Sequence, residues 1–219
     1  MRIGIVGGTG KEGSGLGIRW ALAGHEVLIG SRDPERARGK AAELAARAPG
    51  ARVSGMSNLD AVTAAEIVVL TVPASGLAAT LPEVRPACRG KIVVSTVVPL
   101  TFGGGRLFTP PPQGSSAEEA QEILGPEARV VAAFHHIAAH ELQAGDHSIE
   151  CDLLLCGGDA EAKDVVTKLG ESMGLRAVDV GALTNAGPLE GITAVLATIN
   201  RRYKLKNSGI KITGLPGRR

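Results

Sequence analysis

The chain has 219 residues, of which 44% are apolar and only 2% aromatic, and its formal net charge is +2. This length accommodates one domain with a real core, which aliphatic side chains must fill, as in parallel sheets covered by helices. The balanced charge argues against nucleic acid as the main partner, and no apolar run reaches the roughly 18 residues that a membrane helix needs.

The cysteines indicate a reducing compartment. There are three of them, without a CxxC pair, and Cys151 and Cys156 share one apolar run. Such residues are typical of buried thiols rather than of a disulfide. Met1 leads directly into a core strand, so no signal peptide is expected and the protein is expected to be cytoplasmic.

The first 32 residues read as strand, glycine-rich turn, helix and second strand. The apolar run Arg2 to Gly7 is followed by Gly8-Thr9-Gly10-Lys11-Glu12-Gly13, which fits G-x-G-x-x-G. In this motif the first glycine permits a tight turn, the second lets backbone approach a pyrophosphate, and the third lets helix pack on strand. The helix then directs its free N–H groups at the phosphates. All six motif residues are therefore candidate dinucleotide-binding residues, with a purely structural glycine turn as the alternative.

The end of the second strand favours NADP over NAD. An NAD site usually has Asp or Glu there to bind the ribose hydroxyls, but this chain has Ser31 and Arg32 and no acid before Asp33. A hydroxyl followed by a guanidinium suits a 2′-phosphate, and Arg36 could add a second cation. The alternative role of Ser31 is to cap a helix that begins at Pro34.

The remaining pattern alternates strands with helices, which predicts an α/β fold with a Rossmann-like, doubly wound, mainly parallel sheet. Further helices are expected at 34–47, 59–65, 117–124 and 160–173, and a long one with Pro188 as its first residue. Further strands are expected at 52–54, 66–73, 91–99, 129–134, 151–156 and 177–180. We divide the chain into a dinucleotide-binding domain, 1–140, and a smaller C-terminal part, 141–219.

Two strand ends should line the cofactor crevice, because ligands of doubly wound sheets lie over the carboxyl ends of the strands. They carry Val72 with Pro73 and Val98 with Pro99. Simple strand termination is the alternative role of both prolines, and it does not conflict with lining a site.

A histidine-rich segment follows the strand at 129–134. His136 and His140 are four residues apart and would share a face of a helix, as a metal pair does. No cysteine or acid completes a convincing ligand set, so no metal is predicted, and the segment is better read as a loop that lines the site of a second ligand.

Two stretches remain open to two interpretations. The irregular segment 101–116, rich in glycine and proline, fits a lid or a plain surface loop. After Asn200 the chain carries no acid, and its cations form either a solvated tail or a cradle for an anionic ligand: Arg201, Arg202, Lys204, Lys206, Lys211, Arg218 and Arg219.

The chain lacks a usual acid–base apparatus. Tyr203 is followed at the fourth position by Asn207 rather than lysine, so the Tyr-x-x-x-Lys pair of short-chain dehydrogenases is absent, and only the histidines offer proton chemistry. Hydride transfer between two cofactors needs position and dry contact more than proton relays.

Over nearly its whole length the sequence resembles the coenzyme F420-dependent NADP oxidoreductases. The resemblance lies in Gly7-Gly8-Thr9-Gly10, Gly24-His25-Glu26, Gly30-Ser31-Arg32, Val69-Leu70-Thr71-Val72-Pro73, Lys91-Ile92-Val93-Val94-Ser95, His135-x-Ile137, Cys156-Gly157 and Gly209-Ile210-Lys211. It implies reversible hydride transfer between C4 of the NADPH nicotinamide and C5 of the deazaflavin. It also implies a homodimer, with the 188–202 helix as our candidate interface and part 141–219 completing the F420 site.

The resemblance assigns roles to matching residues. Thr9, Ser31 and Arg32 match positions that hold the 2′-phosphate, and Arg36 stands where relatives can carry lysine. Positions beside NADP are matched by Val72, Val98 and Ala139, and the loop under the deazaflavin by His135 and Ile137, with His135 orienting or shielding it. Gly76 and Ser208 match cofactor-contact positions where relatives can have other side chains. An NADP-linked flavin or ferric reductase and a non-catalytic NADP sensor are the alternatives, because fold alone does not separate them.

Overall fold

The computed structural model describes residues 1–103, 105–145 and 147–215. Their strands are β1 Arg2–Val6, β2 Glu26–Ser31, β3 Val53–Ser57, β4 Ile67–Leu70, β5 Ile92–Ser95, β6 Arg129–Ala133, β7 Asp152–Gly157 and β8 Arg176–Asp179. Their helices are α1 Lys11–Leu22, α2 Pro34–Arg47, α3 Asn58–Ala64, α4 Leu77–Cys88, α5 Ser116–Leu124, α6 Ala139–Ala144, α7 Ala160–Ser172 and α8 Ala186–Tyr203. Short 3₁₀ turns occupy Ala74–Gly76 and Leu183–Asn185.

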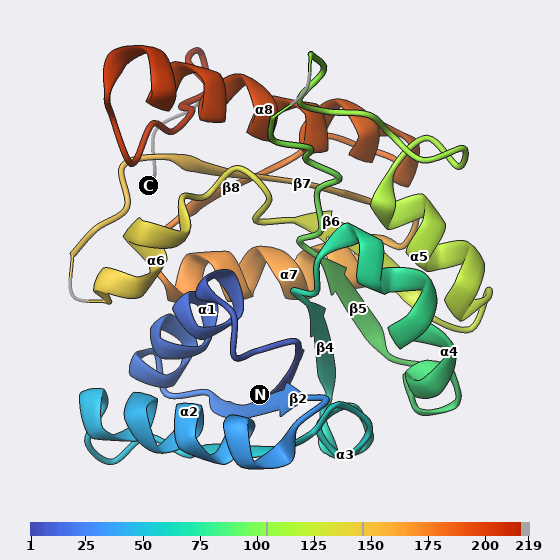
Figure 1. The fold of residues 1–219 in the computed structure, drawn as a ribbon, viewed down its shortest axis with the longest axis vertical. Helices are drawn as coiled ribbons and strands as arrows, with labels where there is room; N and C mark the ends of the chain where they lie inside the picture. Colours follow the sequence, from blue (N-terminus) through green and yellow to red (C-terminus); the bar gives the residue numbers. More distant parts are fainter. Residues whose placement is uncertain (104, 146, 216–219) are drawn as a thin grey trace.

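One sheet runs through the molecule in the order β3-β2-β1-β4-β5-β6-β7-β8, with helices on both faces (Figure 1). Strands β1 to β6 are parallel, β7 is antiparallel to β6, and β8 is parallel to β7. The expectation of a doubly wound, mainly parallel sheet is therefore confirmed. The sheet continues across residue 140 through the β6–β7 pair, and the division into 1–140 and 141–219 stays a prediction.

The reversal at β7 decides what meets at the functional edge. The chain moves outward from β1 to β3 and returns to β4 on the other side of β1, so the switch point lies between β1 and β4. Because β7 and β8 run against the other strands, their first residues, Asp152 and Arg176, lie at the edge where β1 to β6 end.

Aliphatic side chains fill both layers of core, as the composition predicts. On one face α1, α2, α6 and α7 pack over residues such as Ile5 and Leu153, and on the other α3, α4, α5 and α8 pack over residues such as Leu70. Two aromatic residues sit in the first layer, where the rings of Trp20 and Phe134 meet edge to face with centroids 5.6 Å apart.

Several local expectations need correction. Helix α4 was not predicted, because Pro82 and Pro86 normally interrupt a helix. Here both prolines are exposed, so the backbone carbonyls left without a partner can reach water. Helix α8 begins at Ala186, two residues before Pro188, which still lies in the first turn, where no helical N–H bond is lost. The three cysteines are free and buried, as expected.

Candidate functional site

The glycine loop bridges the switch point through its backbone. Gly7 has φ +76°, and a Cβ there would lie 2.8 Å from Val72 Cγ1 of the segment after β4. The N–H of Gly8 donates to the carbonyl of Gly30 at 2.9 Å, which ties the loop to β2. Only glycine permits this conformation and this proximity together. The Gly7 N–H also donates to the side-chain Oδ1 of Asn58 at 3.2 Å, which ties the turn to α3.

The other two glycines of the motif differ in their surroundings. A Cβ on Gly13 would lie 2.6 Å from Thr71 Oγ1 and 2.7 Å from Gly8 Cα, inside the fold. A Cβ on Gly10 would have its nearest neighbour 3.6 Å away, and Gly10 is exposed at the start of α1. The fold itself requires Gly13, whereas the open space at Gly10 is available to a ligand that approaches the helix N-terminus.

At the end of β2 two guanidinium groups remain available. Ser31 is buried and its Oγ accepts from Asp33 N at 3.1 Å. Asp33 caps α2 by accepting from Glu35 N at 3.0 Å and from Arg36 N at 3.3 Å, so the alternative that Ser31 is the cap is wrong. Arg32 and Arg36 are exposed, and no hydrogen bond or ion pair joins either guanidinium to another residue in the described part of the chain. The arrangement suits a phosphate.

A cavity of about 200 Å³ opens between the first turn of α1, the loop after β6 and one face of α8. It brings together five of the residues predicted from the sequence, Glu12, His135, Ile137, Ala139 and Ser208. His136 and Ala138 also line it, and they belong to the histidine segment that was predicted to line the site of a second ligand. The rest of the lining was not predicted: Thr193, Leu196, Ala197 and Asn200. The predicted residues Val72, Pro73, Gly76, Val98 and Pro99 lie instead after the neighbouring strands β4 and β5.

His135 presents an uncharged ring to this cavity. Burial, with a smaller contribution from His136, lowers the pKa of His135 to about 3, so the imidazole is neutral near pH 7. Both ring nitrogens are buried and have no hydrogen-bond partner within the described residues. Its carbonyl is held by Thr193 Oγ1 at 3.0 Å. The preceding Phe134 has φ +68°, a strained conformation that is found where surrounding structure holds the chain in place.

Glu12 supplies a second unsatisfied group to the same cavity. Its Oε1 is enclosed and lacks a hydrogen-bond partner in the part of the chain that the structure describes. Burial raises the pKa of Glu12 to about 8, so the carboxyl is mainly protonated at pH 7. The sequence placed Glu12 in the site only as a member of the glycine motif. The signal that was missed is an acid between the last two glycines of the motif, in the first turn of the helix.

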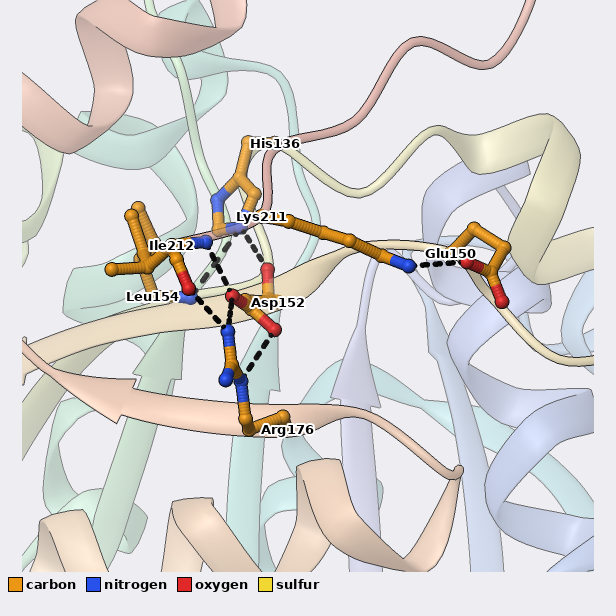
Figure 2. A network of polar contacts seen from close by, with 7 residues as sticks. All are labelled: His136, Glu150, Asp152, Leu154, Arg176, Lys211 and Ile212. Carbon is orange, nitrogen blue, oxygen red and sulfur yellow. Dashed lines mark hydrogen bonds and ion pairs between the residues drawn. The ribbon is translucent and has the colours of Figure 1, made fainter. Parts of the chain in front are cut away.

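A polar network fixes the C-terminal segment beside the cavity (Figure 2). The buried Asp152 carboxylate accepts from Arg176 Nε at 2.8 Å and from Ile212 N at 2.6 Å, and Arg176 Nη2 donates to the Ile212 carbonyl at 2.6 Å. The Arg176 hydrogen bonds lower the pKa of Asp152. Asp152 N donates to the Ile210 carbonyl at 2.7 Å, and its own carbonyl lies 2.8 Å from His136 Nε2. Asp152 thus joins the histidine loop, through its backbone carbonyl, to the tail, through its carboxylate and its N–H.

Two further buried charges hold the helices that line the cavity. Arg19 of α1 donates to three carbonyls at the end of α6 and beyond it, those of Glu141, Leu142 and His147. Glu190 of α8 accepts from the first N–H groups of α5, at 3.0 and 3.1 Å, and burial raises the pKa of Glu190 to about 7. Partners this far apart in the chain carry no local sequence signal.

The histidine segment does not form a metal pair. His136 is buried and precedes α6, where it bonds to β7, whereas His140 lies in α6 and is exposed. Among the residues described, no group of three His, Cys, Asp or Glu side chains is placed to hold a metal ion. Nor is any described helix both long and apolar enough to cross a membrane.

The irregular stretch and the tail are partly held by other elements. Leu100 and Phe108 form an isolated antiparallel bridge, and Thr101 N donates to the Leu107 carbonyl at 2.9 Å. In the tail, Lys211 pairs with Glu150, whereas Arg201, Arg202, Lys204 and Lys206 are exposed around the end of α8. Gly104, Arg218 and Arg219 lie outside the described residues.

The fold and this site define a Rossmann-type dinucleotide-binding protein whose glycine loop faces a second ligand cavity. Residues 2–99 match the sequence model of the family described as NADP oxidoreductase coenzyme F420-dependent. The F420-dependent NADP reductase of Methanothermobacter marburgensis is 40% identical over a 224-residue alignment that covers 99% of this chain and 100% of that protein. The corresponding reductase of Methanocaldococcus jannaschii is 39% identical, with 98% and 99% covered. The chain belongs to the family of coenzyme F420-dependent NADP oxidoreductases, as the resemblance indicated.

A solved structure agrees with this assignment. The crystal structure of a proposed F420-dependent NADP reductase from Arthrobacter sp. FB24 matches with a TM-score of 0.81 at 27% identity, covering 97% of this chain and 99% of that one.

Proposed function

We propose that this protein transfers a hydride reversibly between C4 of the NADPH nicotinamide and C5 of the deazaflavin of coenzyme F420. The observation that carries the proposal is the cavity that begins at the first turn of α1 and is walled by the His135 loop and α8. A dinucleotide on the glycine loop would present its nicotinamide to this cavity, and the near-full-length relatives are named for this pair of coenzymes.

In this proposal the nucleotide side of the crevice holds NADP(H). The 2′-phosphate would be bound by Thr9, Ser31, Arg32 and Arg36, of which both arginines are exposed and unpaired among the described residues. The pyrophosphate would lie on Gly8, Gly10, Lys11 and Gly13 at the start of α1. The nicotinamide half would run past residues that follow β4, β5 and β6: Val72, Pro73, Gly76, Val98, Pro99 and Ala139.

The opposite side would hold the deazaflavin against the nicotinamide. Ile137 and Ser208 line the cavity. The neutral His135 ring offers one N–H donor and one acceptor nitrogen, and both are buried without a partner among the residues that the structure describes. An uncharged imidazole can orient a ring system without attracting water. The protein would act mainly by bringing the two carbon atoms together in a dry contact.

We further propose that the protein is a cytoplasmic homodimer in which part 141–219 completes the F420 site and the dimer. Its buried free thiols are consistent with a reducing compartment. Apolar side chains on the outer side of α8 support the interface, since Val195 is 58% and Tyr203 65% exposed. Light scattering after gel filtration tests this: the wild type should be a dimer and Val195→Lys a monomer, and a monomeric wild type would exclude this interface.

The reaction is tested by mixing protein, NADPH and purified F420 and following loss of the oxidised deazaflavin absorbance, with FMN and NADH as controls. Bleaching that needs both NADPH and F420 is expected. Bleaching of FMN instead would make the protein a flavin reductase, and tight NADPH binding without turnover would make it a sensor. His135→Ala should slow turnover with F420 but leave NADPH affinity intact. Loss of NADPH affinity would assign the loop to the nucleotide.

A further inference from the structure

Among the described residues, three side chains that line the cavity have buried polar atoms without a hydrogen bond. These atoms are Oε1 of Glu12, both ring nitrogens of His135 and Nδ1 of His136. An unpaired buried polar atom is costly, so native structures keep one where a ligand or water satisfies it. The three groups therefore mark where a ligand is expected to meet the protein.

Among the described residues that line the cavity, none places a cationic side chain at the Glu12 carboxyl. The other titratable groups of this lining are His135 and His136, and burial lowers the pKa of both. From α6, the Glu141 carboxylate is bound to His147 and Asn207, and His140 is exposed. Lys11, beside Glu12 on α1, is exposed. Burial therefore keeps the carboxyl mainly protonated at pH 7, although Glu12 lies in the first turn of α1.

A ligand can supply a compensating positive charge. A nicotinamide ring is uncharged when reduced and carries a positive charge when oxidised. In a dry crevice, a carboxylate beside the ring would favour the oxidised form strongly, because the attraction between unlike charges is little screened there. A neutral carboxyl would accept the reduced form without penalty. Glu12 lines the same cavity as Ala139, which the proposed function places beside the nicotinamide half of the nucleotide.

We propose that Glu12 is the proton-exchanging group of this crevice: it is protonated with NADPH bound and gives up its proton as the hydride leaves. The inference rests on the proposed function. The C4–H bond of NADPH breaks with both electrons, which form the C5–H bond of the deazaflavin, and reduction of the deazaflavin also takes up one proton at ring nitrogen N1. The O–H bond of Glu12 breaks to supply that proton, an N1–H bond forms, and the carboxylate remains beside the new nicotinamide cation. The reverse reaction returns the proton to Glu12.

Proton release upon nucleotide binding tests this without any turnover. Calorimetry of NADP+ and NADPH binding at pH 7, in two buffers that differ in ionisation enthalpy, should show close to one proton released with NADP+ and almost none with NADPH. Between pH 6 and 8 the ratio of the two affinities should shift towards NADP+ by up to about tenfold per pH unit. The 2′-phosphate is common to both nucleotides, so its titration cancels.

Glu12→Gln should bind both nucleotides and release no proton with either, and its affinity ratio should not change with pH. The matched control is Glu83→Gln, which removes an exposed carboxylate on α4 and should behave as the wild type. Equal proton release with NADP+ and NADPH, or release retained in Glu12→Gln, would overturn the proposal. The wild-type affinity ratio decides the matter even if Glu12→Gln does not fold. Failure of the wild type to bind either nucleotide would instead overturn the proposed function.

Discussion

On the nucleotide side of the crevice the shape is set mainly by backbone atoms and one neutral side chain, whereas on the opposite side charged side chains set it. The glycine loop is held by hydrogen bonds from Gly8 N to the Gly30 carbonyl and from Gly7 N to Asn58 Oδ1, and by the lack of space for a Cβ at Gly7 and Gly13. The residues that follow β2 are held by hydrogen bonds between near neighbours in the chain, such as those from Glu35 N and Arg36 N to the Asp33 carboxylate.

The opposite wall depends on partners that are far apart in the chain. Asp152 and Arg176 hold the tail, Arg19 holds α6, and Glu190 holds the start of α5. Each of these groups is buried or partly buried, so removing one partner leaves an uncompensated charge or an unpaired backbone group. Steric changes should therefore damage the nucleotide side most, whereas changes of charge and pH should damage the opposite wall.

The largest effect is expected from Gly13→Ala. The added Cβ would lie 2.6 Å from Thr71 Oγ1 and 2.7 Å from Gly8 Cα, so α1 must shift away from the glycine loop and from the segment after β4. We expect a loss of about 1–3 kcal/mol of stability, measured by urea unfolding, together with loss of NADPH binding. Gly10→Ala is the control, because its Cβ has room in the fold. It should stay within about 1 kcal/mol of the wild type and still bind NADPH poorly. Unimpaired binding by Gly10→Ala would contradict the placement of the pyrophosphate.

The same contrast explains what the sequence could predict. The glycine motif, the Ser31-Arg32 pair and most strands are local patterns, and the parallel sheet follows from their order. The antiparallel turn at β7, the α8 wall of the cavity and the Asp152–Arg176 network depend on contacts between distant segments. Even the interpretation of Glu12 required the structure, since only its burial distinguishes it from an ordinary first-turn acid.

Arg32→Ala tests the nucleotide side by charge rather than by shape. A charge-assisted bond to a phosphate contributes about 1.5–3 kcal/mol, so NADPH affinity should fall about 10- to 100-fold. NADH lacks the 2′-phosphate, and its weaker binding should hardly change. Fluorescence titration with both nucleotides measures the two effects, and equal losses would exclude the assignment of Arg32 to the 2′-phosphate.

Arg176→Met should destabilise the opposite wall of the crevice, because it leaves the Asp152 carboxylate without its guanidinium partner. We expect a lower melting temperature and a raised KM for F420, with the KM for NADPH nearly unchanged. Arg176 lowers the pKa of Asp152 in the folded protein. The pair therefore stabilises the fold fully at a pH above the pKa that the carboxyl has in the unfolded chain, and this stabilisation is lost as the pH falls through the folded pKa. The difference between wild type and variant should therefore shrink in acid. The double variant Asp152→Asn/Arg176→Met should recover part of the loss, because no buried charge is left unpaired.

Glu190→Gln should reveal the opposite dependence on pH. The raised pKa of Glu190 means that the folded protein binds its proton more tightly, so stability falls as the pH rises from about 4.5 to about 7. The whole effect is on the order of 1–3 kcal/mol. Glutamine cannot ionise, so the variant should show a flatter pH profile in urea unfolding. If the stability of the variant falls with pH as steeply as that of the wild type, groups other than Glu190 cause the pH dependence.

The smallest effect is expected from the cations at the end of α8. Replacing Lys204 and Lys206 with glutamine should raise the KM for F420 a few-fold, because both are exposed in the segment that leads from Asn200 to Ser208 at the cavity. Added salt should raise the KM of the wild type for F420 towards that of the variant, since exposed charges are screened. Lys211→Gln is the contrast, because Lys211 already pairs with Glu150 and should matter less. If all three replacements leave the KM unchanged at low salt, the tail is solvated surface, and the wall acts on F420 through the cavity alone.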